Sequence, residues 1–165
     1  GDTNDEPDIF VHDQVTGETT RVSVSSSGAQ ADDRAYDPKI SGDGRYVVFS
    51  SRATNLVNGD TNGEQDIFVH DRQTGETTRV SVSSSGVEAD DQNYDPFISA
   101  DGLTVTWTSR ATSLIAGDTN EEKDIYVHDR LTGETSRVSV ASSGAESPLI
   151  TKRPRTSLKS TKKRR

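Results

Sequence analysis

Short runs of apolar and β-branched residues, separated by turns rich in glycine, asparagine and aspartate, follow one another along most of this chain. Residues 46–49 and 104–107 are β-branched and aromatic, which suits a packed, pleated strand. Residues 67–69 are apolar without alternation, as expected for a strand covered on both faces. No stretch of helical length shows an apolar period of 3.6 residues. The pattern therefore predicts an all-β protein.

One unit recurs along the chain every 58 residues. Its marker Gly-Asp-Thr-Asn begins at Gly1, Gly59 and Gly117, and a second marker, Asp-Pro-x-Ile-Ser, begins at Asp37 and Asp95. Residues 59–86 and 117–144 are identical at 22 of 28 positions. Such self-similarity indicates a repeat architecture. The chain holds fewer than three copies of the unit, entered part-way through.

Each unit contains four short strand candidates. In the order of a complete unit they are residues 38–41 and 96–99, then 45–51 and 103–109, then 8–13, 66–71 and 124–129, and last 19–25, 77–83 and 135–141. In the last group, Val80 and Val82 alternate with Arg79 and Ser81, which is typical of an edge strand with one face in water. Four antiparallel strands repeated at a fixed period predict the blade of a β-propeller.

Two segments of the unit resemble a known family. They are residues 40–51, Ile-Ser-Gly-Asp-Gly-Arg-Tyr-Val-Val-Phe-Ser-Ser, and residues 66–71, Asp-Ile-Phe-Val-His-Asp. A Ser-x-Asp-Gly hairpin, a β-rich strand and then an Asp-Ile-apolar-Val strand are similar to the WD40-like repeat of TolB-type bacterial proteins. The resemblance covers residues 1 to about 150. It implies a propeller fold, a bacterial periplasmic, cell-envelope or secreted setting, and a binding or scaffolding role.

The ten predicted strands make two and a half blades, whereas closed propellers have about four to eight. We expect a half blade over residues 1–35 and blades over residues 36–93 and 94–146, with residues 147–151 resembling the start of a further blade. Three alternatives follow. The chain is cut from a longer one, copies of it complete a ring, or its open blade edges self-associate.

Composition and charge exclude several classes of protein. The chain has 165 residues, no cysteine and no apolar run near the ~18 residues that span a bilayer, which argues against a disulfide framework, a thiolate metal site and a membrane span. Residues 1–150 carry 27 acidic and 11 basic groups, a formal charge of −16. Residues 151–165 carry eight basic groups and no acid, and we expect this tail to be disordered. Because the acidic body repels phosphate and the tail has no aromatic residue, we do not expect specific nucleic-acid binding.

The loop before the third strand is a candidate metal site. Oxygen-bearing side chains stand at every second position, and a curled loop can bring them together around a hard cation. The candidate calcium ligands are Asp2, Asn4, Asp8, Asp60, Asn62, Glu64, Asp66, Asp118, Asn120, Glu122 and Asp124. Calcium prefers six to eight oxygen ligands, although the spacing is not that of an EF-hand. The alternative is that these residues form turns and bond to the backbone at the strand start.

Two further groups of residues could carry chemistry. His12, His70 and His128 stand at one position of the unit, each followed by an aspartate. A catalytic pair is normally built once, so their recurrence predicts a structural bond repeated in each blade. Paired acids at residues 32–33 and 90–91 could serve as a general acid and base, but their polar loop favours solvated charge. The abundant serines lack the Gly-x-Ser-x-Gly nucleophile elbow.

The sequence thus predicts a non-catalytic propeller module that presents loops to protein or carbohydrate ligands, with calcium as the candidate cofactor. The alternative is the propeller portion of a larger secreted hydrolase or lyase whose catalytic residues lie outside this segment. The apolar pairs at residues 56–57 and 114–115 are predicted to anchor a long loop on the blade, and Trp107 to lie in the core.

Overall fold

A computed structural model describes residues 2–119, 122–141 and 143–145, and within these ranges the chain forms strands and loops without a helix. The strands are β1 (Phe10–His12), β2 (Thr19–Arg21), β3 (Ala35–Ile40), β4 (Tyr46–Ser51), β5 (Asp66–Asp71), β6 (Thr77–Arg79), β7 (Asn93–Ile98), β8 (Thr104–Ser109), β9 (Asp124–Asp129) and β10 (Thr135–Arg137). All pairings between them are antiparallel. The prediction of an all-β protein is confirmed.

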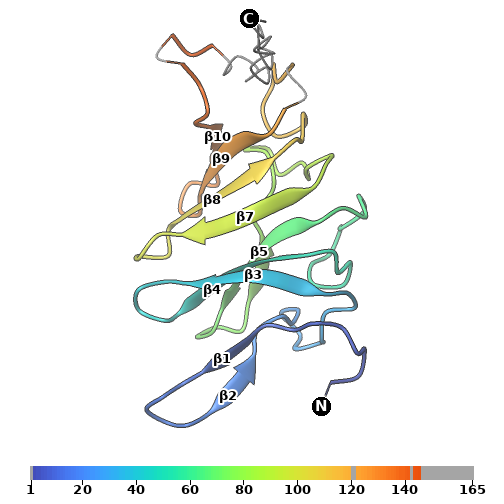
Figure 1. Cartoon of the computed structure of the whole chain (residues 1–165), viewed down its shortest axis with the longest axis vertical. Helices are drawn as coiled ribbons and strands as arrows, with labels where there is room; N and C mark the ends of the chain where they lie inside the picture. Colours follow the sequence, from blue (N-terminus) through green and yellow to red (C-terminus); the bar gives the residue numbers. More distant parts are fainter. Residues whose placement is uncertain (1, 120–121, 142, 146–165) are drawn as a thin grey trace, which may run out of the picture.

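The strands form three sheets that follow one another along the long axis of the molecule (Figure 1). We call them blade 1 (β1-β2), blade 2 (β3-β4-β5-β6) and blade 3 (β7-β8-β9-β10). Blades 2 and 3 have the same strand order, with the first strand at one edge and the last at the other. The basic tail and residues 147–151, for which a disordered segment and a further strand were predicted, lie outside the described residues.

Each junction between blades is an apolar core. Val47, Phe49 and Phe68 on one face of blade 2 pack against blade 1, together with Ile9 and Val22. The other face of blade 2 presents Val48, Ile67 and Val69 to Trp107 and Tyr126 of blade 3. Both faces of blade 2 are therefore covered, and all six residues of β5 are buried, as the unbroken apolar run predicts.

The long loop between the second and third strands of each unit is anchored as predicted. Leu56 and Leu114 are each only 2 % exposed and belong to the two cores, and Trp107 is 1 % exposed. These loops therefore have defined positions at the edge of each junction, where the pockets described below are formed.

The last strand of the unit is shorter than predicted, because the chain turns inward after Arg79. The Val80 amide still donates to the Ile67 carbonyl, but Val82 leaves β5 and forms a bridge with Glu88. Ser81 is completely buried, and the Arg79 side chain is 10 % exposed. The expectation that these two residues face water is therefore wrong: both turn toward the start of β5.

The first strand of the unit begins earlier than predicted. β3 starts at Ala35 and β7 at Asn93, and in each the pairing register shifts around an aspartate with positive φ, 53° at Asp37 and 54° at Asp95. A proline follows each aspartate and cannot donate to the sheet, so a bulge at this point interrupts the pairing without losing a donor.

The hairpins that follow β3 and β7 bring blades 2 and 3 together at one edge. The Gly42 amide donates to the Ala100 carbonyl at 2.9 Å. The Tyr46 ring lies against Gly102, and its centroid is 4.7 Å from the guanidinium carbon of Arg45 and 4.2 Å from that of Arg130. This contact fixes the position of one blade relative to the next.

Candidate functional site

The predicted calcium loop of blade 2 surrounds an arginine. The Arg79 Nη1 lies 3.4 Å from Asp60 Oδ1, 3.1 Å from Asp66 Oδ2 and 2.8 Å from Glu88 Oε2. Carboxylate oxygens of these three acids lie within 4.8 Å of one another. The side chains of Asp60 and Asp66 are 3 % and 0 % exposed. The Arg79 guanidinium contacts both of them and supplies positive charge at the centre of this buried cluster.

Hydrogen bonds fix the rest of this loop. Asp66 Oδ1 accepts from the Ser81 hydroxyl at 2.6 Å and from the Asn93 side-chain Nδ2 at 3.2 Å. Asn62 donates to the Ala89 carbonyl and accepts from the Glu64 amide nitrogen, which makes it a turn residue. Of the predicted ligands of this copy, the structure thus brings Asp60 and Asp66 together, and the Asn62 side-chain amide donates to Asp66 Oδ2 at 3.2 Å, whereas Glu64 is not part of the carboxylate group.

The other two copies have related arrangements. In blade 1, Arg21 Nε contacts Asp8 Oδ2 at 3.2 Å, and the Gln30 side chain stands where blade 2 has Glu88 and donates to Asp2 Oδ1 at 2.7 Å and also to Asn4. In blade 3, Arg137 Nη1 lies 3.1 Å from Asp118 Oδ1 and 3.2 Å from Asp124 Oδ2. Asn120 lies outside the described residues, and Glu122 is exposed.

The sequence analysis did not identify the central arginine, Glu88 that contacts it, or Ser81 that donates to Asp66. A signal was present, because Arg21, Arg79 and Arg137 recur at the 58-residue spacing of the acidic loop. The alternation of residues 79–82 was interpreted as an edge strand with one face in water, and that interpretation is wrong. A basic residue that recurs in step with an acidic loop is better explained as its partner.

One buried carboxylate of the cluster, that of Asp60, has too few hydrogen bonds to offset the cost of burying its charge. Asp60 Oδ1 accepts no hydrogen bond among the described residues. Burial, together with the nearby Asp66 charge, raises the pKa of Asp60 to about 6, and burial also raises the pKa of Asp66. At blade 1 the equivalent Asp2 is exposed, and its hydrogen bond from Gln30 lowers its pKa.

These opposite shifts predict opposite pH dependences. The folded-state pKa of Asp60 is raised from 3.8, so its contribution to stability is full below pH 3.8 and is lost as the pH rises through about 6. The free energy of unfolding of Asp60→Asn, compared with the parent chain, should therefore shift in favour of the variant between pH 4 and pH 7.5. The pKa of Asp2 is lowered from 3.8, so its contribution to stability is present above that value and is lost as the pH falls below it; the shift for Asp2→Asn should therefore have the opposite sign and lie mainly below about pH 4. Denaturant titrations at several pH values measure both, and equal shifts would contradict the prediction.

The calcium site stays a prediction, and its test is thermal. A melting temperature that rises with calcium, falls with chelator and loses this response in Asp60→Asn with Asp66→Asn would support a bound ion. A melting temperature that is the same with calcium and with chelator would contradict it. The arginine contacts explain how the carboxylates are held together in the folded chain without deciding between these outcomes.

The three histidines make one repeated contact. The Nδ1 atoms of His12, His70 and His128 lie 2.8–2.9 Å from the hydroxyl of the threonine across the hairpin. Burial lowers the pKa of His70 and His128, which favours the neutral form of both rings. Asp71, which follows His70, instead accepts hydrogen bonds from Nε and Nη2 of Arg45, and this hydrogen bonding lowers its pKa. These contacts agree with the predicted structural bond in each blade.

The paired loop acids are also held by hydrogen bonds. Asp32 accepts from the amide and hydroxyl of Thr54 at 2.8 and 2.9 Å, and Asp90 accepts in the same way from Thr112 at 2.7 Å. Each acid thus ties the loop that enters one blade to the long loop that follows its second strand. The interpretation as merely solvated charge misses this role.

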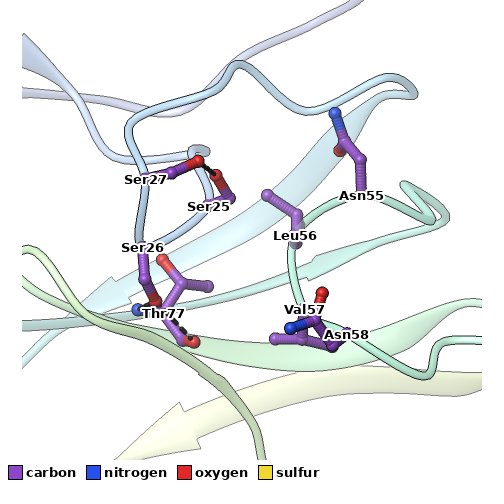
Figure 2. A pocket seen from close by; sticks show the side chains of 8 residues that line it. All are labelled: Ser25, Ser26, Ser27, Asn55, Leu56, Val57, Asn58 and Thr77. Carbon is purple, nitrogen blue, oxygen red and sulfur yellow. Dashed lines mark hydrogen bonds between the residues drawn. The ribbon is translucent and has the colours of Figure 1, made fainter.

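A pocket of about 420 Å³ lies at the junction of blades 1 and 2, on the side where these loops meet (Figure 2). Ser25, Ser26 and Ser27 form one wall, residues 55–58 form another, and Thr77 closes it. The Ser25 and Ser27 hydroxyls are hydrogen-bonded to each other, and the Thr77 amide donates to the Ser26 hydroxyl at 2.9 Å. Leu56 is the buried apolar side chain of the lining.

The same pocket recurs at the junction of blades 2 and 3. Its lining is 58 residues further along the chain, with residues 83–85 and 112–116 as its walls, and its volume is also about 420 Å³. Ser84 repeats the role of Ser26, because it accepts from the Thr135 amide at 2.9 Å. We call the two sites the rim pockets. Sequence reasoning missed them, because their walls come from loops distant in the sequence.

Comparisons with known proteins address the fold. No protein-family model matches the chain, and neither does any curated protein. Among solved structures, it is similar to a protein described as TolB from Agrobacterium tumefaciens, with 20 % identity over 79 % of this chain and 40 % of that one, and a TM-score of 0.49. It is also similar to the tricorn protease, with 15 % identity over 84 % of this chain and 11 % of that one, and a TM-score of 0.50.

These likenesses bear on architecture alone. The chain spans 40 % of the first protein and 11 % of the second, so their activities do not transfer to it. The tricorn protease likeness, together with the four-stranded antiparallel sheets packed face to face, confirms the fold that the repeat motifs predict. The chain has the fold of a partial β-propeller.

Proposed function

We propose that this chain is a non-catalytic binding module whose ligand, a protein or a carbohydrate, lies across the rim pockets. The observation that carries the proposal is their recurrence: two junctions built from different residues form pockets of the same size and place. A ligand that follows this rim would meet equivalent pockets in succession, and two linked contacts bind more tightly than either alone.

The chemistry of the pockets supports a polar ligand. Hydroxyl groups of serine and threonine line them beside an aliphatic residue, Leu56 in one and Leu114 in the other. In the first pocket, Asn58 is exposed and its side chain makes no hydrogen bond to any described residue, so its amide can both donate and accept. Ala116 stands at the equivalent place in the second, which predicts that the first pocket contributes more to polar recognition.

The proposal is tested by arrays of glycans and of peptides, followed by titration of each ligand found. Asn58→Arg and Ala116→Arg would block one pocket each, and Gln14→Arg in the exposed turn between β1 and β2 is the matched control. We expect each blocking variant to weaken binding at least about tenfold, which corresponds to ~1.4 kcal/mol. A ligand whose affinity is unchanged in both blocking variants would show that the rim pockets are not its site.

The predicted setting and partners are part of the same proposal. A propeller module in the bacterial periplasm, cell envelope or extracellular space agrees with the resemblance to TolB-type repeats. Within the described ranges, no helix is long and apolar enough to cross a membrane. Self-association through open blade edges and the alternative of a larger hydrolase or lyase stay predictions. Solution mass tests the first, and the sequence of any adjoining domain tests the second.

A further inference from the structure

Two asparagine–glycine pairs stand in the long loop between β4 and β5, Asn58-Gly59 and Asn62-Gly63, and the sequence contains no other such pair. Glycine has no Cβ, so its amide nitrogen is open to reaction with the side-chain amide of the asparagine before it. Neither glycine amide donates a hydrogen bond to any described residue. The loop belongs to blade 2, which is packed on both faces. The two pairs therefore differ mainly in what holds the asparagine side chain.

The Asn62 side chain is held at both ends. Its Oδ1 accepts from the Glu64 amide at 2.8 Å, and its Nδ2 donates to the Ala89 carbonyl at 2.9 Å and to Asp66 Oδ2 at 3.2 Å. The side chain would have to break these bonds before its carbonyl carbon, Cγ, could approach the Gly63 nitrogen. The fold thus protects this pair.

The Asn58 side chain has no such bonds. It is exposed, and it lines the first rim pocket next to Val57 (Figure 2). The carbonyl of Gly59 accepts from Arg79 Nη2 at 3.1 Å, so the backbone after Asn58 is anchored while the side chain is free to turn. The structure therefore leaves one of two chemically equal pairs open to reaction.

We propose that Asn58 is a site of spontaneous deamidation, whereas Asn62 is protected in the folded chain. The Gly59 nitrogen loses its proton and forms a bond to Cγ of Asn58, and Nδ2 leaves as ammonia. Water then opens the five-membered succinimide at either of its carbonyl carbons and leaves aspartate or isoaspartate. Water is the one co-reactant, and no electron is transferred.

The modification changes one rim pocket and not the other. A carboxylate only accepts hydrogen bonds, whereas the Asn58 amide also donates them. The second pocket has Ala116 at the equivalent place, which has no group that reacts in this way. The effect on binding rests on the proposed function: a ligand that accepts a hydrogen bond from Asn58 loses its donor. The two pockets therefore become less alike as the protein ages.

The experiment follows the folded 165-residue chain during incubation at mildly alkaline pH. Trypsin releases residues 53–72 as one peptide that contains both pairs, and fragment mass spectra locate each conversion. We expect Asn58 to convert at least about tenfold faster than Asn62, because Asn62 must first break its hydrogen bonds. The matched control is a synthetic peptide of residues 53–72, in which the two pairs should convert within about twofold of each other.

Two outcomes would overturn the modification site. One is conversion of Asn62 as fast as, or faster than, that of Asn58 in the folded chain. The other is an unreacted Asn58 over the time in which the synthetic peptide reacts at both pairs. Neither measurement needs a ligand, so both are independent of the proposed function.

The effect on binding is tested with a ligand that the arrays identify. Asn58→Gln keeps a side-chain amide but would have to close a six-membered ring, which is much slower. Incubation should weaken binding to the parent chain about fivefold and leave Asn58→Gln within about twofold of its fresh sample. Conversion of Asn58 without loss of affinity would contradict the proposed role of its amide in the rim pocket, so the two proposals fail in different ways.

Discussion

Arg79→Met is expected to destabilise the chain by about 3–5 kcal/mol, because it leaves buried carboxylates without their cation. Methionine keeps much of the apolar part of the side chain but cannot balance the negative charges of Asp60, Asp66 and Glu88. In the parent chain a carboxylate oxygen of each acid lies 2.8–3.4 Å from Arg79 Nη1. The free energy of unfolding from denaturant titration measures the effect. Arg52→Met, at an exposed position, is the control and should change stability by less than about 0.5 kcal/mol.

Charge, and not lost packing, should account for most of that effect. The triple variant Arg79→Met, Asp60→Asn, Glu88→Gln removes two of the three negative charges together with the arginine. It should therefore be more stable than Arg79→Met alone, in line with the general rule that an unpaired buried charge costs more than a removed pair. If Arg79→Met has nearly the stability of the parent, or if the triple variant is no better, the arginine is not what holds this loop.

Gly102→Ala is expected to be much more harmful than the same change at Gly44, the equivalent position one unit earlier. Both glycines have positive φ, 73° and 72°, so both variants bear a similar backbone cost of about 1–2 kcal/mol. A Cβ at Gly102 would lie 2.2 Å from the Tyr46 ring, whereas at Gly44 the nearest atom is 3.8 Å away. Overpacking should add about 1–3 kcal/mol at Gly102.

Movement of the Tyr46 ring would disturb its contacts with two guanidinium groups, those of Arg45 and Arg130. A double-mutant cycle with Tyr46→Ala isolates the contact. In that background, Gly102→Ala should cost no more than Gly44→Ala. Equal costs of the two glycine variants in the parent chain would show that Tyr46 does not reach across from blade 2 to blade 3.

The strands could be predicted because each is a local pattern repeated two or three times. The unbroken apolar run of β5 indicates burial on both faces, and the Asp-Gly pairs mark the hairpins. The start of β3 could not be predicted in the same way. Asp37 and Pro38 usually indicate a turn, and here they form a bulge inside a strand that had already begun at Ala35.

The functional features depend on neighbours that are distant in the sequence. Glu88 reaches Arg79 from the loop after the last strand, and its counterpart in blade 1 is Gln30, so the repeat does not mark that position as acidic. Each rim pocket is formed by two loops, one on each side of a blade junction. The sequence of a serine-rich loop does not indicate which other loop it will pack against. The alternation of apolar and polar residues also gave the wrong prediction at Ser81. A buried serine that donates a hydrogen bond to an aspartate has the same sequence pattern as an exposed serine.

The most direct test of the account is a crosslink between blades 2 and 3. A Cβ at Gly42 would lie 3.2 Å from the Ala100 Cβ, and disulfides need about 3.5–4.5 Å, so a few tenths of an ångström of opening suffices. The chain has no cysteine of its own. Gly42→Cys with Ala100→Cys should therefore form an intramolecular disulfide in dilute, mildly oxidising buffer, while Gly75→Cys with Ala100→Cys stays reduced. If the first pair also stays reduced in the folded chain, the two blades are not packed hairpin against hairpin, and the stacked propeller arrangement is wrong.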